Sequence, residues 1–95
     1  MPEATITLPN PTGLHARPAK VFARAAASVA AEVIVSKDGR DVNGKSVLSV
    51  LTLDCHQGDE ITIRTSGEGA DEALAELVRL VGSGLGESGV ETSEA

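Results

Sequence analysis

A histidine followed by basic residues at helical spacing is the group of side chains in this sequence best suited to chemistry. No acidic residue lies between Glu3 and Glu32, although the protein as a whole has a formal net charge of −6. The titratable side chains of this stretch are one histidine and three cations: His15, Arg17, Lys20 and Arg24. The cations are three and four residues apart and therefore share one face of a helix. This face is predicted to attract an anion.

The helix that carries these cations is expected to begin at Ala16, directly after the histidine. The unpaired N–H groups at a helix N-terminus bind anions, and a neighbouring guanidinium adds to that attraction. A neutral imidazole at this position has a lone pair that can attack phosphorus. We therefore expect His15 to bond a phosphoryl group whose oxygens accept from the amides of Ala16 and Arg17 and from the Arg17 side chain. An ordinary surface histidine remains the alternative on spacing alone.

The elements around this helix follow from periodicity, which predicts an α+β domain in the order β-α-β-β-α-β-α. Strands are expected over residues 3–8, 32–37, 40–43 and 60–65, and the clearest helix over 71–81. Periodicity does not decide residues 46–53, although Ser46 as an N-cap favours a short helix. The apolar stripes of the two longer helices are Ala19, Phe22, Ala23 and Ala26, and Leu74, Leu77, Val78 and Val81. One domain is predicted over residues 1–86, followed by a flexible tail over 87–95.

Composition excludes several classes of function. The acidic net charge argues against nucleic acid or an anionic membrane as partner. No stretch approaches the ~18 apolar residues of a membrane helix, and a single cysteine, Cys55, fits a reducing compartment, so we expect a soluble cytoplasmic protein. Phe22 is the only aromatic residue. A core of small aliphatic side chains leaves little room for an enclosed pocket, and we expect no cofactor.

A metal site is the remaining chemical alternative. The soft ligands considered are His15, Cys55 and His56. The adjacency of Cys55 and His56 fits no common zinc spacing, so no metal site is predicted. Cys55 is interpreted as an inert small residue near a strand end and His56 as a turn residue.

Two short motifs resemble those of a known family. Residues 13–19, Gly-Leu-His-Ala-Arg-Pro-Ala, resemble the active-site signature of HPr, the histidine-containing phosphocarrier of the bacterial phosphoenolpyruvate:sugar phosphotransferase system. Residues 43–47, Asn-Gly-Lys-Ser-Val, resemble its second, serine-containing motif, and the similarity spans roughly residues 3–81. The resemblance implies an open-faced β-sandwich, with a four-stranded antiparallel sheet and three helices on one face. It also implies a covalent carrier rather than an enzyme, phosphorylated at Nδ1 by enzyme I and dephosphorylated by enzyme II A components.

The resemblance assigns roles to individual residues. It makes His15 the phosphoacceptor and Arg17 its electrostatic partner. The docking surface for acidic partners would comprise Lys20, Arg24, Val47, Leu48 and Leu51. Lys20 departs from the family pattern, because the family usually has a small residue there; it either strengthens phosphate or partner binding or is a solvated helix residue. Ordinary core packing remains the alternative for the three apolar residues.

Ser46 raises a separate hypothesis. In part of the family this serine is phosphorylated by an ATP-dependent kinase, and the product binds a transcriptional regulator. The alternative is a plain helix N-cap, and the two are compatible. Nothing in the sequence demands more than a monomer.

Overall fold

The computed structural model describes residues 2–86, and its elements follow the predicted order. They are β1 (Glu3–Thr7), α1 (Ala16–Ala27), β2 (Glu32–Lys37), β3 (Arg40–Asn43), α2 (Val47–Leu51), β4 (Glu60–Ser66) and α3 (Ala70–Gly82). The undecided stretch over residues 46–53 thus contains a short helix. The predicted tail over residues 87–95 lies outside the described residues.

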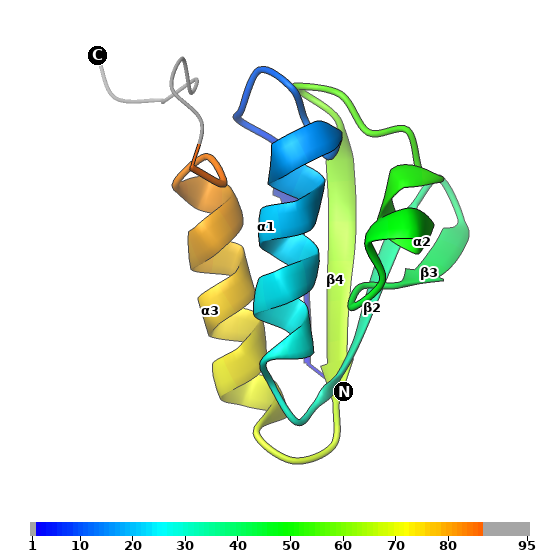
Figure 1. Cartoon of the computed structure of the whole chain (residues 1–95). Helices are drawn as coiled ribbons and strands as arrows, with labels where there is room; N and C mark the ends of the chain where they lie inside the picture. The colour runs from blue at the N-terminus through cyan, green and yellow to red at the C-terminus, as the bar shows by residue number, and fades with distance from the viewer. Residues whose placement is uncertain (1, 87–95) are drawn as a thin grey trace.

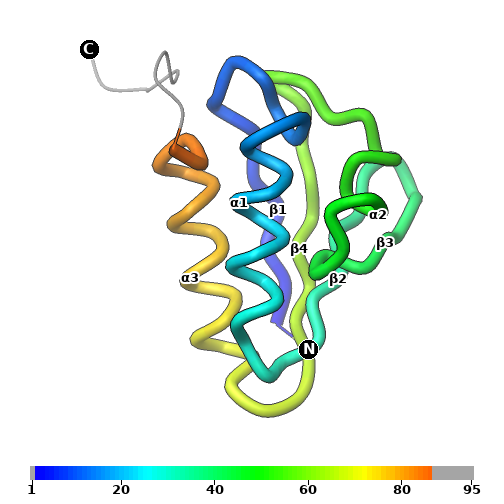
Figure 2. Tube along the Cα trace, viewed as in Figure 1, coloured from blue at the N-terminus to red at the C-terminus, as the bar shows by residue number. Residues whose placement is uncertain are grey.

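The four strands form one antiparallel sheet in the order β1-β4-β2-β3. The three helices lie on the same side of this sheet, with α1 beside α3 and the short α2 close to β2 and β3 (Figure 1). The Cα trace shows α1 and α3 running side by side, roughly along the direction of β1 and β4 (Figure 2). The predicted open-faced sandwich is therefore confirmed.

The core lies between the sheet and the helices. Phe22 is fully buried, together with the predicted alanines of α1, and faces the inward-pointing valines and isoleucines of β2 and β4. In α3 the buried residues are Ala73, Leu77 and Val81, while Leu74 and Val78 are only half-buried. Ala73 therefore replaces Leu74 in the predicted stripe, because the buried row follows i, i+4, i+8 spacing along the helix.

Two loops lie against each other at the end of the sheet where α1 begins. Residues 8–15 form one loop and residues 52–59 the other. The backbone of Leu8 exchanges hydrogen bonds with the second loop, donating to Asp59 O at 2.9 Å and accepting from Gly58 N at 2.9 Å. Leu14 N donates to Cys55 O at 3.1 Å, so the residue before His15 is bonded to the residue before His56. The fold thus unites segments that are far apart in the sequence.

Gly13 allows this close approach. Its φ is +65°, and a Cβ at this position would lie 2.4 Å from Cys55 O and 2.7 Å from His56 Cα. Any other residue would have to push the two loops apart. The conformation is held by Asn10, whose buried side chain donates from Nδ2 to Gly13 O at 2.8 Å.

Candidate functional site

His15 is the N-cap residue of α1 and lies at the mouth of the predicted anion site. Its backbone is extended, with φ −124° and ψ 160°, and its side chain makes no capping hydrogen bond to the helix. The amides of the first turn are therefore not capped by the imidazole. Ala16 follows with φ +51°, a left-handed conformation that costs an L-residue about 1–2 kcal/mol. The start of α1 thus stores backbone strain beside the histidine.

The basic face of α1 lies as the sequence predicts. Arg17, Lys20 and Arg24 are exposed. Together with Ala16 and Val21 they line a shallow hollow that begins at the first turn. Within residues 2–86, none of the three cations forms an ion pair. Their charges are therefore available to an anionic ligand or an acidic partner.

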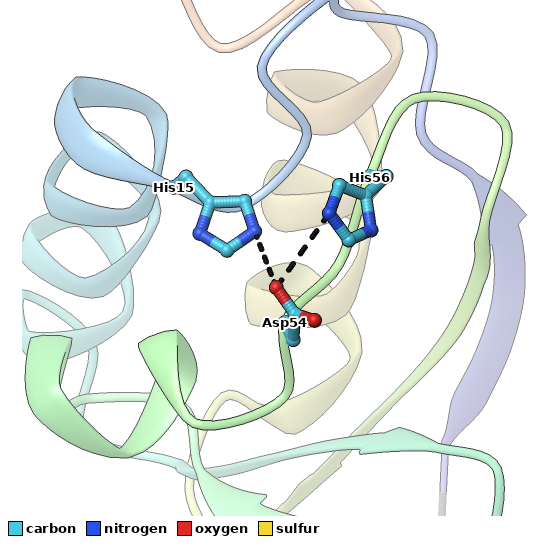
Figure 3. A group of neighbouring side chains, drawn as sticks. All are labelled: His15, Asp54 and His56. Carbon is cyan, nitrogen blue, oxygen red and sulfur yellow. Dashed lines mark ion pairs between the residues drawn. The ribbon is translucent and has the colours of Figure 1, made fainter.

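Two residues of the 52–59 loop complete the site, and the sequence analysis assigned neither to it. Asp54 Oδ1 lies 3.1 Å from His15 Nε2 and 3.6 Å from His56 Nε2 (Figure 3). The two imidazole rings are 5.2 Å apart between centroids and tilted by 48°. The structure thus forms a His-Asp-His cluster from one residue that starts a helix and two residues of a distant loop.

The two ring nitrogens of His15 differ in their surroundings. Nε2 is buried, and Asp54 approaches it closely but outside hydrogen-bonding geometry. Nδ1 points away from Asp54 (Figure 3). The side chain as a whole is 31% exposed. Nδ1 is therefore the ring nitrogen on the side away from the carboxylate.

Asp54 is held in place by its backbone. Its φ is +53°, in the left-handed region that aspartate tolerates better than most residues. Its carbonyl accepts from Lys37 Nζ at 2.9 Å, and the carbonyl of Thr52 accepts from Arg40 Nη1 at 2.9 Å. The β2–β3 hairpin thereby fixes the loop that presents Asp54. A carboxylate and an imidazole two residues apart before a strand are the only sequence signal for this part of the site.

Asp59 contacts both the backbone and the ring of His56. Asp59 Oδ2 accepts from the His56 backbone N–H at 2.8 Å and lies 3.7 Å from His56 Nδ1. It also pairs with Lys37 Nζ at 3.2 Å. The hydrogen bond from the His56 amide, followed by that from Lys37, lowers the pKa of Asp59, while the bond to Asp59 raises the pKa of Lys37. Both groups are therefore charged near neutral pH.

Cys55 takes no part in the cluster, although it lies between two of its members. The side chain is fully buried in the core. Burial raises the pKa of the thiol to about 11, so it stays protonated at neutral pH and is a poor ligand. This agrees with the interpretation of Cys55 as an inert packing residue.

The second motif contains the predicted N-cap. Ser46 Oγ accepts from the Ser49 amide at 3.2 Å at the start of α2. The buried residue of α2 is Val50, whereas Leu48 is 77% exposed. Val47 and Leu51 are half-buried, and Leu51 packs against the core. Core packing therefore explains Leu51 in part but does not explain Leu48.

Comparison with known proteins points to one family. Residues 2–83 match the family model described as the phosphotransferase-system HPr component phosphorylation site. The chain is 43% identical over 88 residues to the phosphocarrier protein HPr of Streptomyces coelicolor, covering 92% of this chain and 95% of that protein. The solved structure of an HPr from Thermoanaerobacter tengcongensis superposes with a TM-score of 0.89 at 39% identity, covering 92% of this chain and 98% of the other.

Another relative is a protein named for catabolite repression. The crystal structure of Crh, a Bacillus subtilis catabolite repression protein, superposes with a TM-score of 0.68 at 36% identity, covering 85% of this chain and 93% of that one. It is described as a domain-swapped dimer. The monomeric state expected for the present chain thus stays a prediction. Within the described part of the chain, no helix has the length and apolar character needed to cross a membrane.

Proposed function

The chain belongs to the HPr family of phosphocarrier proteins of the phosphotransferase system, and from this premise we propose that His15 carries a phosphoryl group. In this proposal enzyme I donates the group to Nδ1, and the A component of an enzyme II accepts it. The observation that carries the proposal is the position of His15. Its side chain is partly exposed, and its Nδ1 points away from Asp54 at a helix start that has no side-chain cap and an unpaired basic face.

The geometry supports attack by Nδ1 rather than Nε2. The carboxylate of Asp54, 3.1 Å from Nε2, favours the tautomer that holds the ring proton on that nitrogen. The lone pair of the neutral ring is then on Nδ1. Attack forms the Nδ1–P bond while the bond from phosphorus to the donor breaks, and the electron pair of that bond leaves with the donor. Asp54 acts as a positioning residue in this step.

The phosphorylated state would be held by the start of α1. Oxygens on Nδ1 would accept from the amides of Ala16 and Arg17 and from the Arg17 guanidinium. This stabilisation has to stay modest, because a carrier that binds its phosphoryl group too tightly cannot transfer it. An exposed site without an enclosing pocket meets that requirement.

We place the docking surface for the partners on α1 and α2. The two helices pack against each other, and the cations of α1 and Leu48 of α2 are all exposed. The proposed contacts are Lys20, Arg24, Val47, Leu48 and Leu51. An exposed apolar side chain on one helix and unpaired cations on the helix packed against it suit a partner with an apolar patch and acidic side chains.

The decisive experiment is labelling with phosphoenolpyruvate and enzyme I. The wild-type chain is expected to take up one phosphoryl group that is labile to acid and stable to alkali. His15→Ala is expected to take up none. The chain has only one other histidine, so His56→Ala is the matched control and is expected to retain the label. Equal labelling of His15→Ala and wild type would contradict the proposal.

Ser46 supports a second, regulatory function. Its hydroxyl caps α2, where an added phosphate would be stabilised by the helix N-terminus. The same phosphate would place negative charge on the surface proposed to dock acidic partners, while creating a new one for a transcriptional regulator. The likeness to Crh favours this candidate. Labelling by ATP and an HPr kinase, lost in Ser46→Ala, is the test. Absence of label in the wild-type chain would contradict this regulatory function.

A further inference from the structure

We propose that His15, Asp54 and His56 form a binding site for a divalent transition-metal ion of the zinc class, and that the bound ion prevents His15 from accepting a phosphoryl group. The site itself follows from the geometry of the three side chains. Its effect on phosphoryl transfer rests on the proposed function.

The distances within the cluster suit a tetrahedral ion. Bonds of 2.0–2.1 Å to nitrogen or oxygen place neighbouring tetrahedral ligand atoms about 3.3 Å apart. Asp54 Oδ1 lies 3.1 Å from one imidazole nitrogen and 3.6 Å from the other, and all three ligand atoms lie within 4.8 Å of one another. The His56 nitrogen has to move slightly closer to Asp54 and to His15, from which no more than 4.8 Å separates it. The His56 side chain is 64% exposed, so it is free to make that adjustment.

The ligand types select the class of ion. Two imidazoles and one carboxylate suit zinc and its first-row neighbours, whereas calcium and magnesium prefer sets made of oxygen ligands. Three protein ligands leave the fourth tetrahedral position to water. The buried thiol of Cys55 is directed into the core and is not needed to complete the set.

The surroundings of the cluster are those of a supported metal site. Histidines that bind metals commonly place their second ring nitrogen against a carboxylate. His56 Nδ1 faces the ionised Asp59 at 3.7 Å. His15 Nε2 is buried without a hydrogen bond, although a carboxylate oxygen lies beside it. An ion bound between His15 Nε2 and Asp54 Oδ1 would give both of these atoms a bonding partner.

Metal binding and phosphoryl acceptance compete for the same ring. An ion on Nε2 takes the lone pair of that nitrogen, and the neutral imidazole then carries its single proton on Nδ1. No proton is gained or lost by the ring in this change of tautomer. Nδ1 has no lone pair left to attack phosphorus, so the zinc-bound protein is inert toward a phosphoryl donor.

Calorimetric titration of the untagged full chain with zinc chloride tests the site. One ion is expected to bind wild type. Loss of either imidazole, in His15→Ala or His56→Ala, is expected to weaken binding by about 10–100-fold or more, since loss of an outer partner alone has that effect. Glu72→Gln, which alters an exposed carboxylate on α3, is the control and is expected to bind like wild type. Absence of binding to wild type, or equal binding to His56→Ala, would overturn the site.

Phosphorylation in the presence of zinc tests the consequence. The ratio of the enzyme I-dependent rates with and without saturating zinc is measured for wild type and for His56→Ala. The ratio of the rate with zinc to the rate without zinc is expected to be at least tenfold lower for wild type than for His56→Ala. Any effect of zinc on enzyme I itself changes both ratios equally. Equal ratios would refute the competition. Failure of wild type to accept phosphate even without zinc would refute the proposed function, while the calorimetric result would still decide the metal site.

Discussion

The two sides of the site differ in how their charges are balanced. On the α1 side, Arg17, Lys20 and Arg24 are exposed and have no ion-pair partner within residues 2–86. On the side of the 52–59 loop, Asp54 faces two imidazoles and Asp59 faces Lys37. Free charge is thus kept for an incoming ligand on one side. Paired charge on the other side fixes the geometry of the acceptor.

The two sides also differ in what holds them. Helical periodicity alone aligns the cations of α1, so their placement survives small changes elsewhere. The loop depends on backbone hydrogen bonds to residues 8–14 and on Lys37 and Arg40 of the β2–β3 hairpin. We therefore expect mutations of the contact between the two loops to have the largest effects.

Gly13→Ala should produce the largest change, because it forces the two sides apart. The new Cβ meets Cys55 O and His56 Cα at distances that no structure tolerates, and φ stays at +65°. We expect a loss of about 2–4 kcal/mol in the free energy of unfolding, measured by chemical denaturation. Cross-ring NMR contacts between His15 and His56 should also weaken.

Gly39→Ala is the matched control for this change. Gly39 has φ +83°, but a Cβ there would meet nothing within 4 Å. It should therefore cost only the conformational strain of about 1–2 kcal/mol and leave the His15–His56 contacts intact. Equal losses in the two variants would show that loop contact adds nothing to the role of Gly13.

Arg17→Ala should have the next largest effect, on transfer rather than on stability. A charge-assisted hydrogen bond contributes about 1.5–3 kcal/mol, so we expect phosphorylation by enzyme I to slow roughly 10–100-fold. The melting temperature should not change, because Arg17 is exposed and unpaired. Arg24→Ala, about two helical turns from Arg17 on the same face, should instead raise the KM of enzyme I for this protein. Rates unaltered with both donor and acceptor would remove Arg17 from the mechanism.

The sequence predicts the α1 side well and the loop side poorly, for a physical reason. His15, Arg17 and the capping Ser46 act through contacts with near neighbours in the chain, and periodicity and capping rules describe such contacts. The approach of Asp54 and His56 to His15 depends on Gly13 and on the pairing of two distant loops, which no local pattern encodes. The prediction of no metal site weighed His15, Cys55 and His56 by their spacing and did not include Asp54, which only the fold brings beside the two histidines. Val50, the buried residue of α2, was likewise not identified, since a five-residue helix has too little periodicity.

Asp54→Asn should slow phosphorylation only modestly. Its carboxylate is 72% exposed, and exposed charge pairs contribute about 1 kcal/mol or less, which corresponds to at most about a fivefold change in rate. Nitrogen chemical shifts of the His15 ring should show the proton partly redistributed from Nε2 to Nδ1. A slower rate without such redistribution would contradict the positioning role and point to a structural one.

Asp59→Asn should have the smallest effect, seen mainly as a change in the pH dependence of stability. The pKa of Asp59 is lowered in the folded state, so the stability it contributes is present above its ordinary pKa of 3.8 and is lost as pH falls through the lower folded value. Wild type should therefore lose melting temperature below about pH 4, and the variant should lose less over that range. The hydrogen bonds from Ser36 and then Arg64 also lower the pKa of Asp41, so Asp41→Asn should likewise reduce the loss of melting temperature below about pH 4. Of these two variants, only Asp59→Asn should shift the resonances of the His56 ring, because Asp59 contacts that residue and Asp41 pairs with Arg64. If both variants leave the His56 resonances unchanged, Asp59 does not hold the loop side of the site, and its paired charge acts on stability alone.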